Sequence, residues 1–502
     1  MINPRALRET REYLSSLPPH AKLEEYSKAM LFMGRYAGLK PAAPAAPLFF
    51  LDGVNYSRHM MEDPLPLGEL SSLFEVEPGY GSVTGDLELG PAVRALEYTR
   101  AKICAASYGL AAEPTLRRVI GDTVVITTSG ATGGVNTALS AALARDREGG
   151  EPYRREIVFN VPNYCLPDAF ARLHGLLAHP IAGTRETGFL PSLEDVRRAC
   201  GPSTLACMLT YPTNPAQTSW GLAHVAAWRS LIEHCQDQGI FLVVDTIFQD
   251  LQWGPYPLLE IFALARSPRF LCKVYSPSKD RPFACGYRIG YLIADRELEP
   301  WAERVESLVN NSCNTLSQVW LAFDVVFRRA LLEDGLSCAA FEPLEDSYVF
   351  GYGAHQPDAI ELHARVVQAG LYQRYAARVR QFLATIDDGL EQIWRWLRGS
   401  LYFEVDPRPP YGNTLMVKVR PPFDAGGEDA YFLDTLIATN VASLVGGCFG
   451  LDTGGDVWFR IVMAGAPPKE VIAAMERVQV FLIERAKQRK AAMSAGGHYA
   501  DG

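Results

Sequence analysis

The sequence predicts an α/β fold built on a mostly parallel sheet. After about residue 120 come five short, nearly continuous apolar runs, and helix-like stretches lie between several of them. The runs are TVVITT, EIVFNV, TLACMLTY, GIFLVVD and FLCKVY. Strands that helices cover on both faces have this unbroken apolar character. Strands that alternate with helices also imply right-handed crossover connections.

The elements around these runs are predicted from their end signals and periodicity. The helix that opens at Ser192 has Asp195 three residues on and stops at Gly201. Residues 302–340 and 358–399 are expected to be largely helical. A last group follows them, with strand candidates TLMVKV, VASLVG and VWFRIVMA and a closing helix from Pro468 to about Lys490.

We therefore expect five regions along the chain. They are an N-terminal arm and linker (1–50, ending in PAAPAAP), a large domain (51–305), a connecting helical segment (306–345), a small α+β domain (346–490) and a disordered tail (491–502).

Composition narrows the class of protein. The 502 residues carry a formal net charge of −9, which argues against a nucleic-acid surface. No stretch approaches the roughly 18 apolar residues of a membrane span, and the N-terminus lacks the apolar core of a secretory signal. The ten cysteines include no C-x-x-C pair. We therefore expect a cytoplasmic protein with reduced thiols and no membrane partner.

Polar residues that can take part in binding or catalysis follow the apolar runs, at the sheet edge where α/β proteins bind ligands. After the first run, the glycine-rich turn Ser129–Gly134 opens a helix, whose N-terminal N–H groups suit a phosphate. After the second comes Tyr164, whose ring can lie over a flat cofactor. After the third, the Asn214 amide can donate to a phenolate oxygen. Each feature alone is equally compatible with an ordinary turn or a packed ring.

The last two runs end in ionisable groups. Asp245 follows the fourth run, where a buried carboxylate requires a partner such as a protonated pyridine nitrogen or an arginine. Lys279 follows the fifth run and can serve as a Schiff-base amine, with Arg288 nearby as a fork for phosphate oxygens. Together the five features supply the contacts that pyridoxal 5′-phosphate needs.

The ordered set SGAT, PNY, YPTNP, VVD, SPSK and GYRIGY resembles the fold-type-I pyridoxal-phosphate enzymes of the aspartate aminotransferase (class I/II) superfamily. The resemblance spans roughly residues 50–485. It implies a large domain with a mostly parallel seven-stranded sheet and a smaller α+β C-terminal domain.

The resemblance also implies a role for each site residue. Lys279 is the Schiff-base lysine, Asp245 pairs with the pyridine nitrogen, Asn214 bonds the 3′ oxygen and Tyr164 stacks on the ring. The phosphate is held by Gly130, Ala131, Thr132, Ser276 and Arg288. Arg460, aided by Asn214, clamps the substrate carboxylate. Tyr80, followed by Gly85, matches the tyrosine that reaches the neighbouring subunit's phosphate, which implies a homodimer with shared active sites.

Three departures mark a divergent member. Phe248 stands where the superfamily usually has a tyrosine that donates to the 3′ oxygen, so we expect a raised Schiff-base pKa. Lys279 and Arg288 are nine residues apart instead of eight. The customary Asn-Pro-Thr-Gly reads Asn-Pro-Ala-Gln from Asn214.

The resemblance implies chemistry at the α-carbon of an amino acid through an external aldimine and a quinonoid, with Lys279, Asp245 and Tyr164 as catalytic residues. Aminotransfer is the first expectation. The alternative is β/γ-elimination, replacement or cyclisation, with S-adenosylmethionine as one candidate substrate. A cofactor-binding regulator is disfavoured because residues 1–50 are too short and too mixed in charge for a DNA-binding domain. His355, Glu361 and His363 are better explained as solvated surface, so no metal is expected.

Overall fold

The computed structural model describes most of the chain. The described residues are 4–31, 48–51, 63–70, 82–85, 89–110, 113–149, 154–252, 257–282, 284–341, 359–424 and 426–494. The PAAPAAP segment, Tyr80 and His355 lie outside these ranges.

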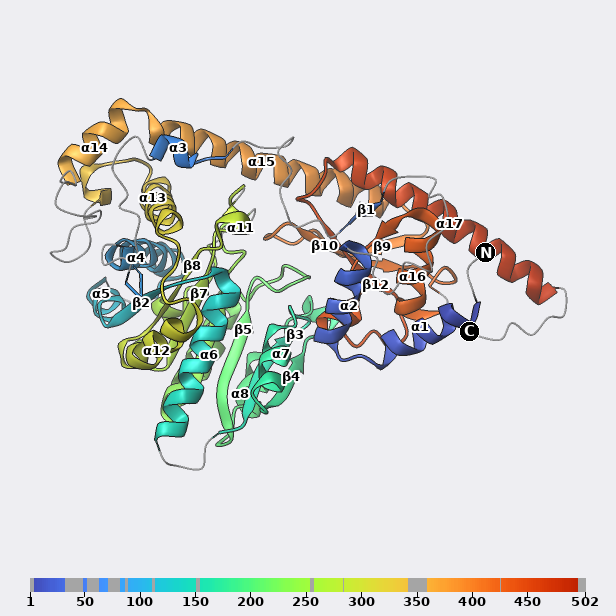
Figure 1. Ribbon diagram of the computed structural model, residues 1–502, viewed down its shortest axis with the longest axis horizontal. Helices are drawn as coiled ribbons and strands as arrows, with labels where there is room; N and C mark the ends of the chain where they lie inside the picture. Colours follow the sequence, from blue (N-terminus) through green and yellow to red (C-terminus); the bar gives the residue numbers. More distant parts are fainter. Residues whose placement is uncertain are drawn as a thin grey trace.

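A seven-stranded sheet forms the centre of the larger lobe in Figure 1. Its order is β2-β8-β7-β6-β5-β3-β4, and β8 runs antiparallel to both of its neighbours. The strands are β2 (Thr123–Thr128), β3 (Glu156–Val161), β4 (Leu177–Ala182), β5 (Thr204–Thr210), β6 (Phe241–Asp245), β7 (Leu271–Tyr275) and β8 (Gly290–Asp295). The predicted α/β class and mostly parallel seven-stranded sheet are confirmed.

Each of the five predicted runs forms a strand of this sheet. The other two strands of the sheet, β4 and β8, had no clear strand signal in the sequence. Strand β4 lies at the sheet edge with mostly exposed or half-buried side chains, so it has no apolar run. Strand β8 is fully buried but directly follows the turn that carries Arg288, where the sequence indicated a ligand loop.

Helices cover both faces of the sheet. On one face α6 (Gly130–Glu148) packs with α12 (Glu299–Val309) and α7 (Leu166–Leu173). The opposite face is covered by α4, α5, α8, α9, α10 and α13, with bounds Leu89–Tyr108, Glu113–Gly121, Leu193–Ala199, Val225–Gln238, Ile261–Leu264 and Thr315–Leu332. The Ser192 side chain caps α8 as its sequence predicts, by accepting from the Glu194 N–H at 3.2 Å.

A second, smaller sheet lies in the other lobe, in the order β12-β10-β9. Its strands are β9 (Phe403–Val405), β10 (Thr414–Val419) and β12 (Trp458–Val462), and α16 (Gly427–Thr439) and α17 (Pro468–Ser494) pack around them. Helix α17 continues four residues into the segment that we expected to be a tail. The boundaries predicted from the sequence remain predictions.

One long helix connects the two lobes. Helix α15 (Leu371–Arg398) follows the short α14 (Ala359–Gln368) and runs along the top of Figure 1 from the larger lobe to the smaller one. Its early residue Tyr375 belongs to the core beneath α13, whereas Phe382, Ile386, Leu390 and Ile393 belong to the core of the small sheet. A single rigid element is therefore anchored in both cores.

The N-terminal arm packs against the C-terminal elements. Helices α1 (Pro4–Ser16) and α2 (Pro19–Leu31) lie beside α16, and β1 (Phe49–Phe50) pairs in parallel with β11 (Val441–Ala442). The Tyr26 ring stacks on Phe432 with 3.9 Å between ring centroids. The Arg11 guanidinium donates to Asp434 at 2.7 Å. The arm thus belongs to the core of the smaller lobe.

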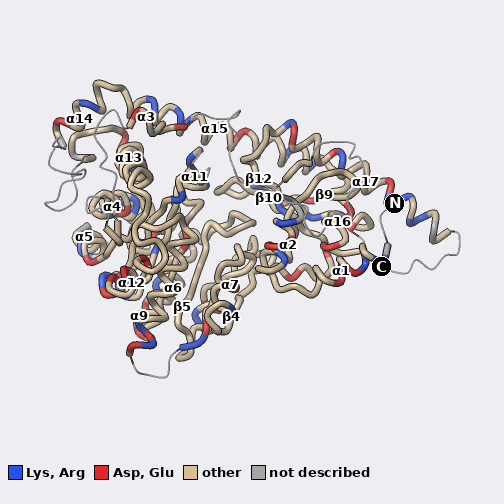
Figure 2. Tube along the Cα trace, in the orientation of Figure 1, with Lys and Arg blue, Asp and Glu red and all other residues tan. Residues whose placement is uncertain are grey.

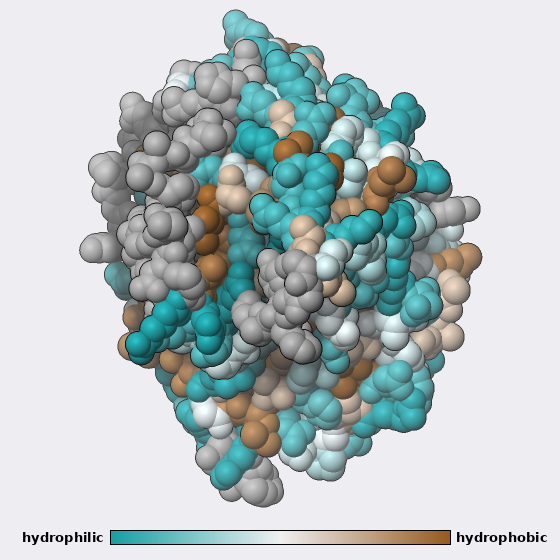
Figure 3. Space-filling view, turned by 90° about the vertical axis from the view of Figure 1, so that its right-hand side faces the viewer, coloured by the Kyte–Doolittle hydropathy of each residue, from teal (hydrophilic) through white to brown (hydrophobic). Residues whose placement is uncertain are grey.

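Charged residues of both signs alternate over the helices (Figure 2). The face shown in Figure 3 is mainly hydrophilic, with apolar side chains in small groups. Within the described ranges, no helix combines the length and apolar character needed to cross a membrane.

Candidate active site

A cavity of about 990 Å³ lies at the carboxyl ends of β5 and β6, between the large sheet and the C-terminal elements. Its size is sufficient for a cofactor together with a small substrate. Most of the predicted site residues line it: Ala131, Thr132, Tyr164, Asn214, Asp245, Lys279, Arg288 and Arg460. Residues far apart in the sequence therefore meet as predicted.

The start of α6 forms one end of the cavity. Gly130 has φ +74°, a conformation that side chains rarely adopt, and a β-carbon added there would lie 3.5 Å from the Arg288 guanidinium. Arg288 donates to the Ser129 carbonyl at 3.4 Å and is exposed. The first N–H groups of a 19-residue helix and an arginine fork thus converge, which is the donor set that a phosphate requires.

The amine of Lys279 lies in the interior of the cavity. Burial, together with the nearby Arg460 and Arg288, lowers the pKa of Lys279 to about 8. An amine with such a pKa is partly neutral near pH 7, so it can attack a carbonyl carbon without prior loss of a tightly held proton.

Asp245 closes β6 and faces the same cavity. Burial raises the pKa of Asp245 to about 7, although the N–H of Ile247 donates to its carboxylate at 3.1 Å. The nearby Lys279 offsets only part of this effect. Because the neighbouring groups offset only part of the cost of burying its negative charge, this carboxylate is suited to a cationic partner such as a protonated ring nitrogen.

Arg460 reaches the cavity from β12. Its Nη1 donates to Asn214 Oδ1 at 3.0 Å, and its guanidinium carbon lies 4.8 Å from the centroid of the Phe449 ring. The Arg460 side chain is buried. Asn214 follows β5, so this bond joins the two lobes and fixes the guanidinium in the cavity wall.

Two aromatic rings line the cavity near these groups. Tyr164 is 45% exposed, and its ring is the candidate to cover a planar ligand. Burial raises its phenol pKa. Phe248 is buried, packs with the core of the smaller lobe and brings no hydrogen-bonding atom to the wall.

Two predicted phosphate contacts do not line the cavity, and a third residue falls outside the described ranges. The Ser276 hydroxyl donates to the Ile289 carbonyl at 2.8 Å and is fully buried, whereas Ser278 lies at the cavity surface. Gly130 lies behind Ala131 against Arg288. Tyr80 is the residue outside the described ranges. The roles of Ser276, Gly130 and Tyr80, like those of the residues that line the cavity, remain predictions.

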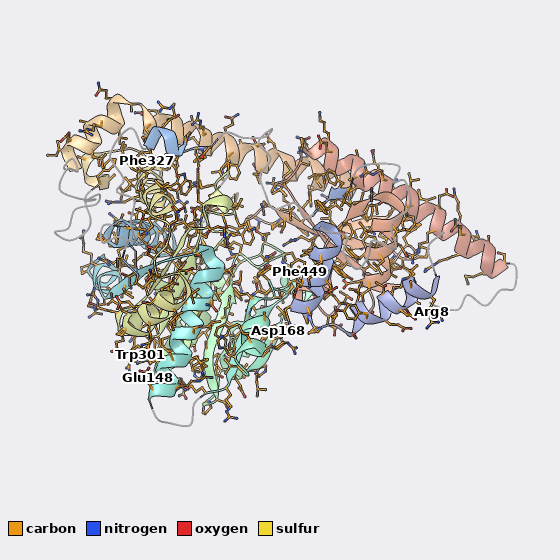
Figure 4. The ribbon with its side chains drawn as sticks, in the orientation of Figure 1. Arg8, Glu148, Asp168, Trp301, Phe327 and Phe449 are labelled. Carbon is orange, nitrogen blue, oxygen red and sulfur yellow. The ribbon has the colours of Figure 1, made fainter. Side chains whose placement is uncertain are left out.

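The N-terminal arm supplies a wall that the sequence did not indicate. His20, Leu23, Glu24 and Ser27 line the cavity from α2, at the spacing of one helix face. His20 Nδ1 lies 2.6 Å from Asp168 Oδ2 on α7. Figure 4 labels Asp168 and Phe449 close to α2, between the lobes. A helical pattern was visible from Lys22 onward, but nothing in it pointed to a ligand.

Behind Lys279 lies a cluster of buried or nearly buried charges, which we call the buried charge cluster. Arg281, two residues after Lys279, donates to Asp324 on α13 at 3.0 Å. Tyr375 on α15 also donates to Asp324, at 2.7 Å. The cluster comprises Glu97, Arg100, Asp250, Glu260, Lys273, Asp280, Arg281, Asp324 and Arg328. It anchors the Lys279 loop to two helices.

Comparison with known proteins agrees with this geometry. Residues 113–323 match the family model for aminotransferase class I and II. Over this segment the chain resembles the fold-type-I aminotransferases. Enzymes of the matched family use pyridoxal 5′-phosphate. The glycine start of α6, Lys279, Asp245 and Arg460 together fit this cofactor in size, charge and donor type.

The sequence relatives of this chain are distant. Histidinol-phosphate aminotransferase of Rubrobacter xylanophilus is 28% identical over 151 residues, or 30% of this chain and 40% of the relative. Aspartate/prephenate aminotransferase of Thermus thermophilus is 25% identical over 241 residues, or 43% and 60%. The chain thus spans about half the length of these curated relatives.

Solved structures share the fold over nearly the whole chain. Aspartate aminotransferase from Thermus thermophilus with maleate gives a TM-score of 0.61 at 18% identity, covering 91% of this chain and 96% of that one. The Rhizobium meliloti aspartate aminotransferase gives 0.62 at 18% identity, covering 93% and 97%.

Proposed function

We propose that this protein is a pyridoxal-phosphate enzyme that removes a proton from the α-carbon of an amino acid, and that its reaction is an aminotransfer. The observation that supports this proposal most strongly is the position of Lys279: a half-buried lysine with a lowered pKa lines one cavity with Asp245, Arg288 and Arg460. The relatives named above, all aminotransferases by name, support the same reaction.

The residues would divide the ligand between them. Arg288 and the first N–H groups of α6 hold the phosphate, and Asp245 holds the ring nitrogen in its protonated form. Asn214 donates its amide hydrogen to the ring oxygen, since its Oδ1 already accepts from Arg460. Tyr164 covers the ring. Arg460 binds the substrate carboxylate through its guanidinium.

When bound, pyridoxal phosphate supplies a carbonyl carbon for the amino group and a ring that withdraws electrons from the α-carbon. The Lys279 amine first holds the cofactor covalently. With the cofactor and substrate bound, the Lys279 Nζ would be the base that accepts the α-proton. Aminotransfer would require the same Nζ to return that proton to the cofactor, so one amine would serve as both base and acid.

We also propose that two copies of the chain form a homodimer. Arg288 and Tyr164 line the cavity and are both exposed, so residues of a second copy can reach the site there. Tyr80 is our candidate for the residue that crosses between copies. Crosslinking of single-cysteine variants at Tyr80 and Arg288 tests this arrangement.

Borohydride reduction followed by peptide mapping tests the cofactor assignment. The expected product is a phosphopyridoxyl group on Lys279. Lys279→Ala should abolish this label, whereas Lys102→Ala, at an exposed lysine of α4, should leave it unchanged. A label on another lysine of the wild-type protein contradicts the proposal.

A panel of amino acids and S-adenosylmethionine tests the reaction. Aminotransfer gives a keto acid in an amount equal to the pyridoxamine form of the cofactor. Release of a β or γ substituent with the cofactor returned unchanged would establish the alternative, elimination or replacement, in its place.

A further inference from the structure

Thr210 is the last residue of β5 and lines the cavity. It lies in register with Asp245 on the neighbouring parallel strand β6. Met208, two residues earlier, lines the same cavity and packs in the core beneath α6. Because side chains alternate along a strand, Thr210 projects to the same side as Met208, as does its neighbour Asp245.

The backbone of Thr210 is held by hydrogen bonds from the neighbouring strand β3. Strands β3 and β5 stop pairing after Phe159 and Met208, and the Asn160 side chain bridges the gap. Thr210 N–H donates to Asn160 Oδ1 at 2.9 Å, and Asn160 Nδ2 donates to the Thr210 carbonyl at 3.2 Å. The residue is therefore fixed by its peptide groups, and its hydroxyl is not needed to hold the strand.

The Thr210 hydroxyl is buried, with 3% of the residue exposed, and has no hydrogen-bond partner among the described residues. Leaving a buried hydroxyl unpaired costs stability, because the group has lost its hydrogen bonds to water. Such a group at the wall of a ligand cavity is accounted for when the ligand supplies the missing partner.

The position of Thr210 restricts which cofactor atom can be that partner. It lies beside Asp245, the candidate for the ring nitrogen, and four residues before Asn214, the candidate for the ring oxygen. In pyridoxal phosphate the ring nitrogen and the oxygen-bearing carbon are separated by one carbon that carries a methyl group. The ring nitrogen is assigned to Asp245, and the methyl group cannot accept a hydrogen bond. The ring oxygen is therefore the atom in this part of the cofactor that can accept a hydrogen bond from the Thr210 hydroxyl. Phe248 on the same wall has no donor.

We propose that the Thr210 hydroxyl donates a hydrogen bond to the ring oxygen of the cofactor, as a second donor beside Asn214. This inference rests on the proposed function. Its consequence is that Thr210 stabilises the ionised ring oxygen, and so tunes the pH at which the bound cofactor changes its absorbance.

Thr210→Val tests the inference, because it removes the hydroxyl and keeps the shape. The expected result is a midpoint of the absorbance titration about 0.5–1 pH unit higher, with cofactor bound about 3–10-fold more weakly. The cofactor-free protein should be at least as heat-stable as the wild type, since an unpaired group has gone. Thr210→Ser should restore the wild-type midpoint.

Thr204→Val is the matched control at the opposite end of the same strand, where the hydroxyl accepts from the Gly201 N–H at 3.0 Å. It should lower stability and leave the titration unchanged. A midpoint that stays fixed in Thr210→Val, or shifts equally in Thr204→Val, overturns the inference. Borohydride labelling of Lys279 in the same samples reports separately on the proposed function.

Discussion

Arg460 Nη1 and Asn214 Oδ1 lie 3.0 Å apart, and this hydrogen bond connects strand β12 of the small sheet to the turn after β5 of the large one. It fixes the position of the guanidinium in the cavity wall. It also orients the Asn214 amide so that its N–H₂ faces away from Arg460.

Arg460→Lys should raise the KM for the amino-acid substrate about 10-fold or more, because an ammonium cannot form the paired hydrogen bonds that a guanidinium makes with a carboxylate. Cofactor labelling at Lys279 should be unaffected. Arg420→Lys, just after strand β10, is the control. Equal KM values for the wild type and Arg460→Lys would remove Arg460 from the substrate site.

The rate of cofactor attachment should depend on pH through the Lys279 amine. Since only the neutral amine reacts, and its pKa is lowered to about 8, the rate should rise about 10-fold per pH unit below pH 8 and level off above it. An ordinary lysine would keep gaining rate up to about pH 10. Mixing the cofactor-free protein with pyridoxal phosphate from pH 6 to pH 10 and following absorbance distinguishes the two profiles.

His20→Ala should raise the KM for the amino acid about 5-fold with a small effect on kcat. The change removes the 2.6 Å contact with Asp168 that holds the α2 wall against α7. His224→Ala, at an exposed histidine of the large lobe, should leave both constants unchanged. If kcat falls while KM stays constant, the α2 wall does not bind substrate.

Asp324→Asn should destabilise the protein by about 3–5 kcal/mol, because Arg281 and Arg328 both lose a buried counter-charge. Asp195→Asn, which disrupts an exposed pair with Arg198, should cost less than about 1 kcal/mol. Urea denaturation of the two variants measures the difference. Equal losses would mean that the buried charge cluster contributes no more than a surface pair.

Phe248→Tyr should lower the pH midpoint of the bound cofactor. The new hydroxyl is added at the cavity wall beside Asp245, where it can donate to the ring oxygen and favour its ionised form. The absorbance titration used for Thr210→Val measures the shift. A midpoint that rises would show that the added hydroxyl disturbs the site instead of binding the cofactor.

Much of the site was predictable because parallel strands end at one edge. Tyr164, Asn214, Asp245 and Lys279 each follow a recognisable apolar run, and the topology alone brings them together. Arg460, from the small sheet, was predicted through the superfamily resemblance.

Other features had no local signal. The α2 wall depends on the packing of Tyr26 against Phe432, a contact between distant segments that periodicity does not reveal. Thr210 is an unremarkable residue of an apolar strand until its register with Asp245 and its unpaired hydroxyl are known. The buried charge cluster draws on single charges in several elements, each of which looks like an ordinary surface residue in sequence.

The N-terminal arm has a consequence for how the protein is made. Arg11 and Asp434 form an ion pair although 423 positions separate them. On the ribosome, α1 and α2 emerge before α16, so the surface on which Arg11 and Tyr26 pack is absent until α16 has been synthesised. Lys279 is translated well before Arg460 and before the arm can dock. A nascent chain that has passed Lys279 but not Arg460 therefore lacks two walls of the cavity, so under the proposed function we expect productive loading with pyridoxal phosphate only after Arg460 has been synthesised and the arm has docked.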